Sequence, residues 1–226
     1  MRAGWVIAAL LATAACSLAN PAAEDFVEAA HADNISLARN FLRDGHPASQ
    51  ANQRGVTALG MACRNANQAL VELLLEHGAS ARSTSGGEPV MLMAARTGNP
   101  SIVRLLLKHG ADANATGNRK QSALMWAAAN GHRDALVALL AAGADPTPTL
   151  GSGFDALMFA TRAGHLDVVT ALIKHGCPPN KAYTPERPGG RNMRANTSPL
   201  ILAIENGHLA LALHLIALGA DPNDQR

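Results

Sequence analysis

The chain has 226 residues, of which 48% are hydrophobic, 16% charged and 3% aromatic, a composition typical of one ordinary folded domain. It excludes a collagen-like protein and a long disordered one. The formal net charge is +2 and there is no dense basic tract, so we do not expect nucleic acid as a partner.

The first 19 residues are typical of a secretory signal peptide. Arg2 is followed by an uncharged run over residues 3–19, which is short for a membrane span and ends in small residues. Two processing routes are open: cleavage after Ala19, or lipid attachment to Cys16 through a lipobox in which Thr13 replaces the usual leucine. A buried N-terminal helix is a third alternative. We expect residues 1–19 to be removed and residues 20–226 to fold.

A repeated unit occupies the rest of the chain. An apolar pair separated by two residues from a glycine recurs six times, and the glycines are spaced by 33, 32, 33, 33 and 43 residues. These glycines are Gly45, Gly78, Gly110, Gly143, Gly176 and Gly219. A second signature begins 21 residues before each of the last five. We expect repeats near residues 24–56, 57–88, 89–121, 122–154, 155–197 and 198–226.

These motifs resemble the ankyrin repeat, whose usual form is TPLHxAAxxGH followed by LLxxGADxN. The closest copies are SPLILAIENGH (residues 198–208) and LLLKHGADAN (residues 105–114), and the resemblance covers residues 24–223. It implies an all-α fold, an ankyrin-repeat solenoid of about six helix-turn-helix repeats with hairpin-like loops. Within one repeat, the spacing predicts that Leu124 and Ala128 lie on the inner side of the first helix, and Leu136 and Leu139 on that of the second.

The repeats depart from the family pattern at two places. None has His at the fourth position of TPLH, where the occupants are Val27, Gly60, Leu92, Met125, Met158 and Ile201. The Thr-to-His network of the family is therefore absent, and we expect apolar packing to replace it. Asp33 and Ala66 stand where a glycine should end the first helix. A non-glycine residue in the left-handed conformation costs about 1–2 kcal/mol, so the first two repeats should be the least stable.

No motif predicts chemistry. The chain contains no GxSxG, HExxH, GxxxxGKS/T or GxGxxG sequence, so we expect neither an enzyme nor a cofactor. Cys63 and Cys177 lie in different repeats, form no CxxC pair, and are interpreted as unpaired core or turn residues. His132, His165 and His208 follow helix-ending glycines, so we interpret them as helix-end contacts and not as metal ligands.

In ankyrin solenoids the concave face, formed by the first helices and the loop tips, is where function is expected. One position on this face carries a large apolar residue in repeats two to six, and three of these are followed three residues later by arginine. The set is Met61, Met93, Trp126, Phe159 and Leu202, with Arg64, Arg96 and Arg162. It is either a partner-binding ridge or packing between neighbouring helices. Trp126 and Phe159 favour the ridge, because the chain has so few aromatic residues.

Two further features are candidates for binding. The 43-residue spacing places an insertion at residues 177–197, which includes Tyr183 and is either a recognition finger or a tolerated loop. On the last helix, Leu209, Leu213 and Ala217 form one stripe. We expect the stripe to be exposed and to dock a partner or a second copy in a homodimer, unless residues 221–226 cover it or the helix turns it inward.

Together these features predict an exported, non-catalytic scaffold that binds another protein in the periplasm, soluble or held at the outer membrane by lipid on Cys16. The chain looks like periplasmic ankyrin-repeat proteins, some of which support exported antioxidant enzymes such as catalases while others neutralise toxins. The alternative is a secreted effector that binds a host protein.

Overall fold

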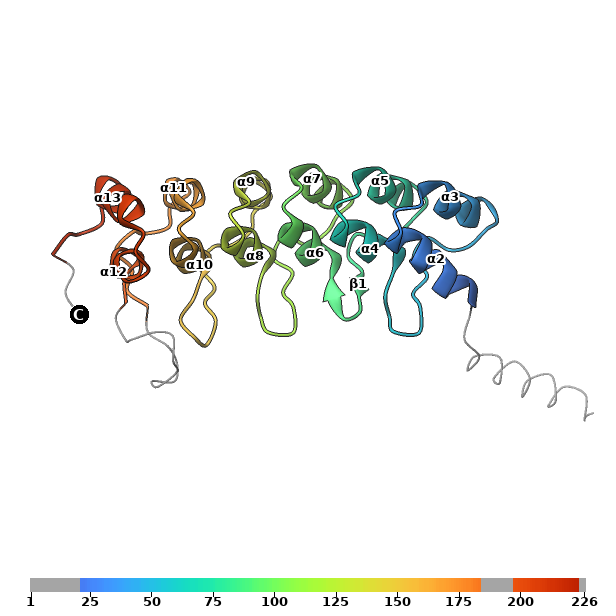
Figure 1. The fold of residues 1–226 in the computed structure, drawn as a ribbon, viewed down its shortest axis with the longest axis horizontal. Coiled ribbons are helices and arrows are strands. Elements are labelled where there is room, and N and C mark those ends of the chain that lie inside the picture. The colour runs from blue at the N-terminus through green and yellow to red at the C-terminus, as the bar shows by residue number, and fades with distance from the viewer. Residues whose placement is uncertain (1–20, 184–196, 224–226) are drawn as a thin grey trace, which may run out of the picture.

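The computed structural model describes residues 21–183 and 197–223, and these form a row of paired helices (Figure 1). The pairs are α2 (Pro21–His31) with α3 (Ile35–Arg43), α4 (Ala58–Arg64) with α5 (Gln68–Glu76), α6 (Val90–Thr97) with α7 (Pro100–Lys108), α8 (Ala123–Ala129) with α9 (Arg133–Ala141), α10 (Ala156–Ala163) with α11 (Leu166–Lys174), and α12 (Pro199–Glu205) with α13 (Leu209–Ala217). The order of elements is that of the predicted solenoid. The predicted signal peptide at residues 1–19, with Cys16, lies outside the described residues.

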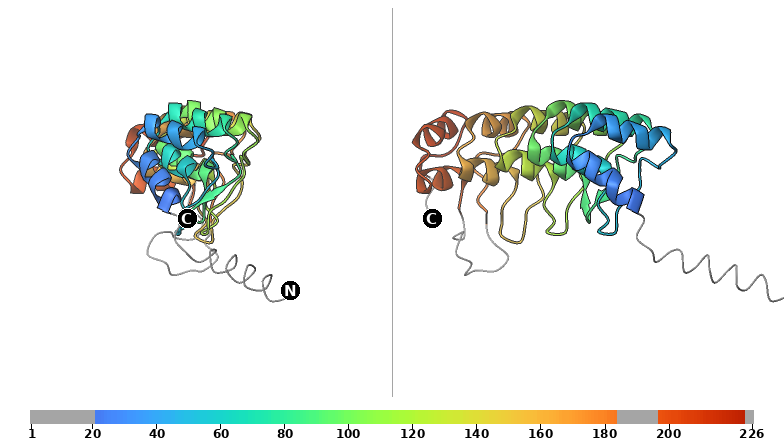
Figure 2. Two further views of the ribbon diagram at one scale, coloured as in Figure 1. Left: turned by 90° about the vertical axis from the view of Figure 1, so that its right-hand side faces the viewer. Right: turned by 45° about the vertical axis from the view of Figure 1, so that its right-hand side comes forward.

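The helices form two rows. The first helix of every pair lies in one row and the second in the other, and the connecting loops project from the row of first helices (Figures 1 and 2). The loop between repeats two and three contains a short antiparallel hairpin of β1 (Thr84–Ser85) and β2 (Glu88–Pro89). Three other loops are closed by one antiparallel bridge each, at Ala51 and Thr57, Thr116 and Ser122, and Tyr183 and Thr197. The hairpin-like loops were therefore correctly expected.

Four first helices begin at the residue that opens the repeated signature. The side chains of Thr57, Ser122, Asp155 and Ser198 accept hydrogen bonds from the backbone N–H three residues later, at 3.1, 3.2, 3.0 and 3.3 Å. Each of them satisfies one of the N–H groups that a helix start leaves without an intrahelical partner. The fixed register of the signature is thus the register of the helix starts.

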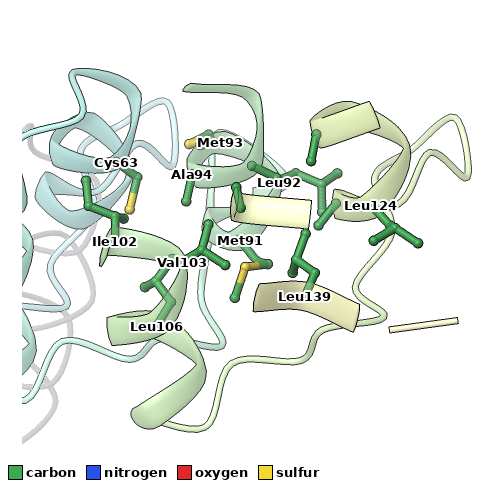
Figure 3. Packing of buried hydrophobic residues seen from close by; sticks show 14 of the residues in the cluster. Cys63, Met91, Leu92, Met93, Ala94, Ile102, Val103, Leu106, Leu124 and Leu139 are labelled. Carbon is green, nitrogen blue, oxygen red and sulfur yellow. The ribbon is translucent and has the colours of Figure 1, made fainter. Parts of the chain in front are cut away.

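One continuous core runs through the repeats. Leu124, Ala128, Leu136 and Leu139 are fully buried, as their spacing predicted. Figure 3 shows Met91 of α6 near Leu106 of α7 and Leu139 of α9, so side chains from neighbouring repeats share the same core. Each repeat is therefore stabilised mainly by its neighbours.

Three histidines join the later repeats. The Nε2 atoms of His132, His165 and His208 lie 3.0, 3.2 and 3.0 Å from the carbonyl oxygens of Arg96, Ala129 and Arg162, at the ends of α6, α8 and α10. Each ring therefore donates to a carbonyl that the helix end leaves free. This confirms the interpretation of these histidines as helix-end contacts.

Two helix ends carry the predicted backbone strain. Asp33 has a φ of 55° and Ala66 a φ of 56°, both in the left-handed region. Asp33 is held there by its Oδ1 atom, which accepts hydrogen bonds from the side-chain amides of Asn65 at 3.1 Å and Asn67 at 3.0 Å. The order of stability among the repeats stays a prediction.

Apolar packing replaces the family's histidine at the fourth signature position in most repeats, where Val27, Leu92, Met125 and Met158 are buried. In the second repeat, where Gly60 stands at this position, the prediction of apolar packing was wrong. A Cβ atom on Gly60 would lie 2.1 Å from the hydroxyl oxygen of Ser85, so only glycine leaves room for that side chain. The same oxygen accepts a hydrogen bond from the backbone N–H of Thr57 at 3.0 Å. A polar contact, and not apolar packing, fills this position.

Candidate protein-binding surface

Trp126 of α8 is the centre of a guanidinium–aromatic contact on the concave face. Its ring is half-buried, and the Arg96 guanidinium lies 4.3 Å from the ring centre. Arg96 also forms an ion pair with Glu88 of β2, which limits the motion of the guanidinium. A cation over a tryptophan face is worth about 0.5–1 kcal/mol at an exposed site. The contact therefore holds a large aromatic side chain in place while part of it faces solvent.

A cavity adjoins Trp126. Its volume is about 280 Å³, and its walls come from the loop tips of two neighbouring repeats and from α6 and α8. The lining residues are Gly86, Gly87, Glu88, Leu92, Gly117, Asn118, Arg119, Gln121 and Trp126. One aromatic wall and several polar groups can receive an apolar side chain and orient the polar groups beside it.

A second guanidinium–aromatic group lies in the fifth repeat. Phe159 is half-buried, and its ring centre lies 5.1 Å from that of the buried Phe154. The Arg162 guanidinium lies 4.8 Å from the centre of Phe154 and 5.4 Å from that of Phe159. The concave face thus presents an aromatic ring with an arginine in two neighbouring repeats.

The predicted apolar ridge is not continuous. Met61, Met93 and Leu202 are only 8%, 5% and 4% exposed, unlike Trp126 and Phe159. The first helices carry small residues and pack closely, so a side chain of ordinary length at this position is covered by its neighbours. Met61 still lines a cavity of about 580 Å³ near α2, together with the exposed Arg64. The exposed part of the ridge is therefore confined to repeats four and five.

Tyr183 does not belong to an exposed recognition finger. It is 3% exposed, and its hydroxyl donates to the Asp155 carboxylate at the start of α10. Its backbone pairs with Thr197 through N–H···O bonds of 2.9 and 3.3 Å, which close the base of the insertion. The remaining part of the insertion, residues 184–196, lies outside the described residues. Tyr183 is therefore an anchor within the fold, and its assignment to a partner-binding surface was wrong.

The comparison with known families decides the identity of the fold. A family model described as ankyrin repeats (3 copies) matches residues 26–117, 78–150 and 124–226. The chain belongs to the ankyrin-repeat family. Ankyrin repeats generally mediate binding to other proteins and are generally non-catalytic. No curated protein matches this sequence.

In the described part of this ankyrin-repeat protein, Cys63 and Cys177 are buried and unpaired, as predicted. Burial raises the pKa of Cys63 to about 12 and, together with the nearby Asp155 carboxylate, raises that of Cys177 to about 11. Both thiols are therefore protonated at neutral pH, which makes them poor nucleophiles and poor metal ligands.

The described part of the ankyrin chain contains neither a metal-binding cluster nor a helix that could span a membrane. Within residues 21–183 and 197–223, no group of three or more His, Cys, Asp and Glu side chains is arranged to hold a metal ion. The helices in the same residues are all too short or too polar to cross a membrane.

The last helix of the ankyrin stack exposes its apolar stripe. Leu209 and Leu213 are 67% and 69% exposed, and Ala217 is also exposed. The predicted exposure is confirmed, and within the described residues neither the tail nor a rotation of the helix covers these side chains.

Sequence reasoning missed two residues of the ankyrin concave face. Glu88 pairs with Arg96, and Phe154 stacks near Phe159. The Gly86–Gly87 pair was a usable signal for Glu88, because two consecutive glycines with positive φ permit the tight turn that brings β2 back beside β1. The position of Phe154 depends on a loop that has no repeated pattern.

Proposed function

We propose that this protein is an exported, non-catalytic scaffold that binds another protein through its concave face. The observation that carries the proposal is the half-buried Trp126, held between Arg96 and a cavity of about 280 Å³. Tryptophan and arginine are enriched among the residues that dominate protein–protein binding energy. The family supports the general role, because ankyrin repeats generally bind proteins.

The partner belongs to one of two classes. In the first, the chain acts in the periplasm, where it supports an exported antioxidant enzyme or neutralises a toxin. In the second, it is a secreted effector that binds a host protein. The compartment in which the processed chain accumulates distinguishes these classes, since only an effector leaves the cell envelope.

Export is tested by the intact mass of the protein recovered from separate cell fractions. We expect loss of residues 1–19, or loss of residues 1–15 with lipid on Cys16. Changing Cys16→Ser should release the protein from the membrane fraction only on the lipid route. Recovery of the full chain from the cytoplasm, with Met1 or Arg2 retained, would contradict export.

Protein binding is tested by a photo-crosslinking amino acid placed at position 118 in the cells that express the chain, because Asn118 is exposed and lines the cavity beside Trp126 while Trp126 itself stays in place. The matched control carries the same group in place of Val137, which is 41% exposed on a second helix, away from the concave face. We expect one discrete protein to be linked at position 118 and not at position 137. If both positions link the same proteins, or neither links any, the concave face is not the binding surface.

A further inference from the structure

The last repeat leaves open a position that earlier repeats bury completely. Ile204 of α12 stands 15 residues before Gly219, and it is 54% exposed. The residues 15 positions before the corresponding glycines are Cys63, Ala95, Ala128 and Thr161, and each is 0% exposed. Figure 1 shows the reason, since α12 and α13 form the end of the described stack. The surface through which each earlier repeat packs on the next is therefore exposed on the last repeat.

The second helix of the last repeat extends this apolar surface. Leu209, Leu213 and Ile216 are 67%, 69% and 39% exposed, and their spacing of four and three residues places them on one side of α13. The large exposed hydrophobic residues of the described chain are Leu37, Val137, Leu166, Ile204, Leu209, Leu213 and Ile216. Four of these seven residues thus lie on the last repeat. We call Ile204, Leu209, Leu213 and Ile216 the terminal patch.

The charges at the two ends of the stack differ. Helix α13 contains no Asp, Glu, Lys or Arg, and its one titratable side chain, His214, contacts the Thr170 hydroxyl at 2.8 Å. At the opposite end, α3 exposes Arg39, Asn40 and Arg43. If the apolar end of one copy covered α3 of another, the two arginines would lose their hydration without gaining a partner. Head-to-tail stacking of two copies is therefore disfavoured. A neutral apolar patch can instead pair with its own copy without bringing like charges together.

We propose that the terminal patch joins two copies of this chain in a symmetric dimer. The four-and-three spacing on α13 is the spacing that forms the seam between two packed helices. In an antiparallel arrangement, a two-fold axis near Leu213 sets Leu209 of one copy against Ile216 of the other. A two-fold interface uses the same patch on both copies and closes, so the assembly stops at two.

The mass of the full chain in solution, measured by sedimentation over a range of micromolar concentrations, tests this dimer. We expect the mass of two copies for the native chain and of one copy for Leu213→Glu, with an unchanged circular dichroism spectrum because the side chain is mostly exposed. The control Val137→Glu places a charge at the equivalent position of the fourth repeat and should leave the dimer intact. A single-copy mass for the native chain, or a dimeric Leu213→Glu variant, overturns the proposal.

A cysteine placed near the axis tests the symmetry without a destabilising charge. Under oxidising conditions Leu213→Cys should form a disulfide between copies, since the axis brings the two side chains together, while Val137→Cys should not. Equal crosslinking at both positions, or none at position 213, also overturns the symmetric arrangement. The result is independent of partner binding at Trp126, because the terminal patch lies on a different repeat.

Discussion

At the scale of single residues, a histidine ring packs against a glycine at three successive junctions. A Cβ atom on Gly98, Gly131 or Gly164 would lie 2.2, 2.8 or 2.8 Å from the histidine ring of the next repeat. These glycines have φ values of 77°, 75° and 78°, so they also end their helices in the left-handed conformation. The same residue type thus meets a backbone requirement and leaves space for the ring.

Asp155 differs from the serine caps because it uses both of its side-chain oxygens. Its Oδ1 atom accepts the N–H of Met158 at 3.0 Å, and its Oδ2 atom accepts the Tyr183 hydroxyl. Burial raises the pKa of this carboxyl, although the Tyr183 hydrogen bond acts in the opposite direction. A serine side chain has a single oxygen, so it could not accept these two hydrogen bonds on separate atoms.

The raised pKa of Asp155 predicts a pH-dependent contribution to stability. The folded chain binds this proton more tightly than the unfolded chain, so the contribution is present below the ordinary value of 3.8 and is lost as pH rises through the raised pKa. Asp155→Asn stays neutral, so its free energy of unfolding relative to the native chain should rise as pH increases above 3.8. Denaturant titrations at several pH values measure this difference.

Asp134→Asn is the matched control for that series, because it removes an exposed carboxylate at the start of α9. A pH-independent difference for Asp155→Asn, or one that falls as pH rises, would show that burial does not govern this carboxyl.

At the scale of elements, the sequence allowed the two helices of each repeat and their core positions to be predicted. These depend on local rules, namely a helical period and a terminating glycine. The contacts at the starts of α9, α11 and α13, the second helices of the last three repeats, could not be predicted in the same detail. Asn34, Asn67 and Asn99 cap their own helices, whereas the histidines of the later repeats reach to the repeat before. A contact between repeats depends on their separation, which the sequence does not state.

The candidate site was only partly predictable for the same reason. Met93 and Trp126 occupy equivalent positions, yet Met93 is buried and Trp126 is half-buried. Trp126 has the larger side chain, and the Arg96 guanidinium lies over its ring. Tyr183 was misplaced because its partner, Asp155, lies 28 residues earlier in the chain.

At the scale of the whole molecule, the stack has two distinct candidate surfaces for association. The concave face carries the aromatic rings of Trp126 and Phe159 in its fourth and fifth repeats, each with an arginine beside it, and the C-terminal end carries the terminal patch. Repeat proteins present such extended surfaces because each repeat contacts only its neighbours and leaves one side of the stack free. The two proposed associations use different repeats, so they would not compete for the same surface.

The most direct test compares binding and stability for Trp126→Ala with Phe159→Ala against Leu139→Ala with Leu140→Ala. We expect the aromatic double variant to weaken the affinity for the partner captured at position 118 by several kcal/mol. Its free energy of unfolding should fall less than that of the core double variant, in which each leucine costs about 2–5 kcal/mol. If the aromatic pair proves as destabilising as the core pair and leaves the affinity unchanged, the aromatic residues of the concave face serve packing and not binding.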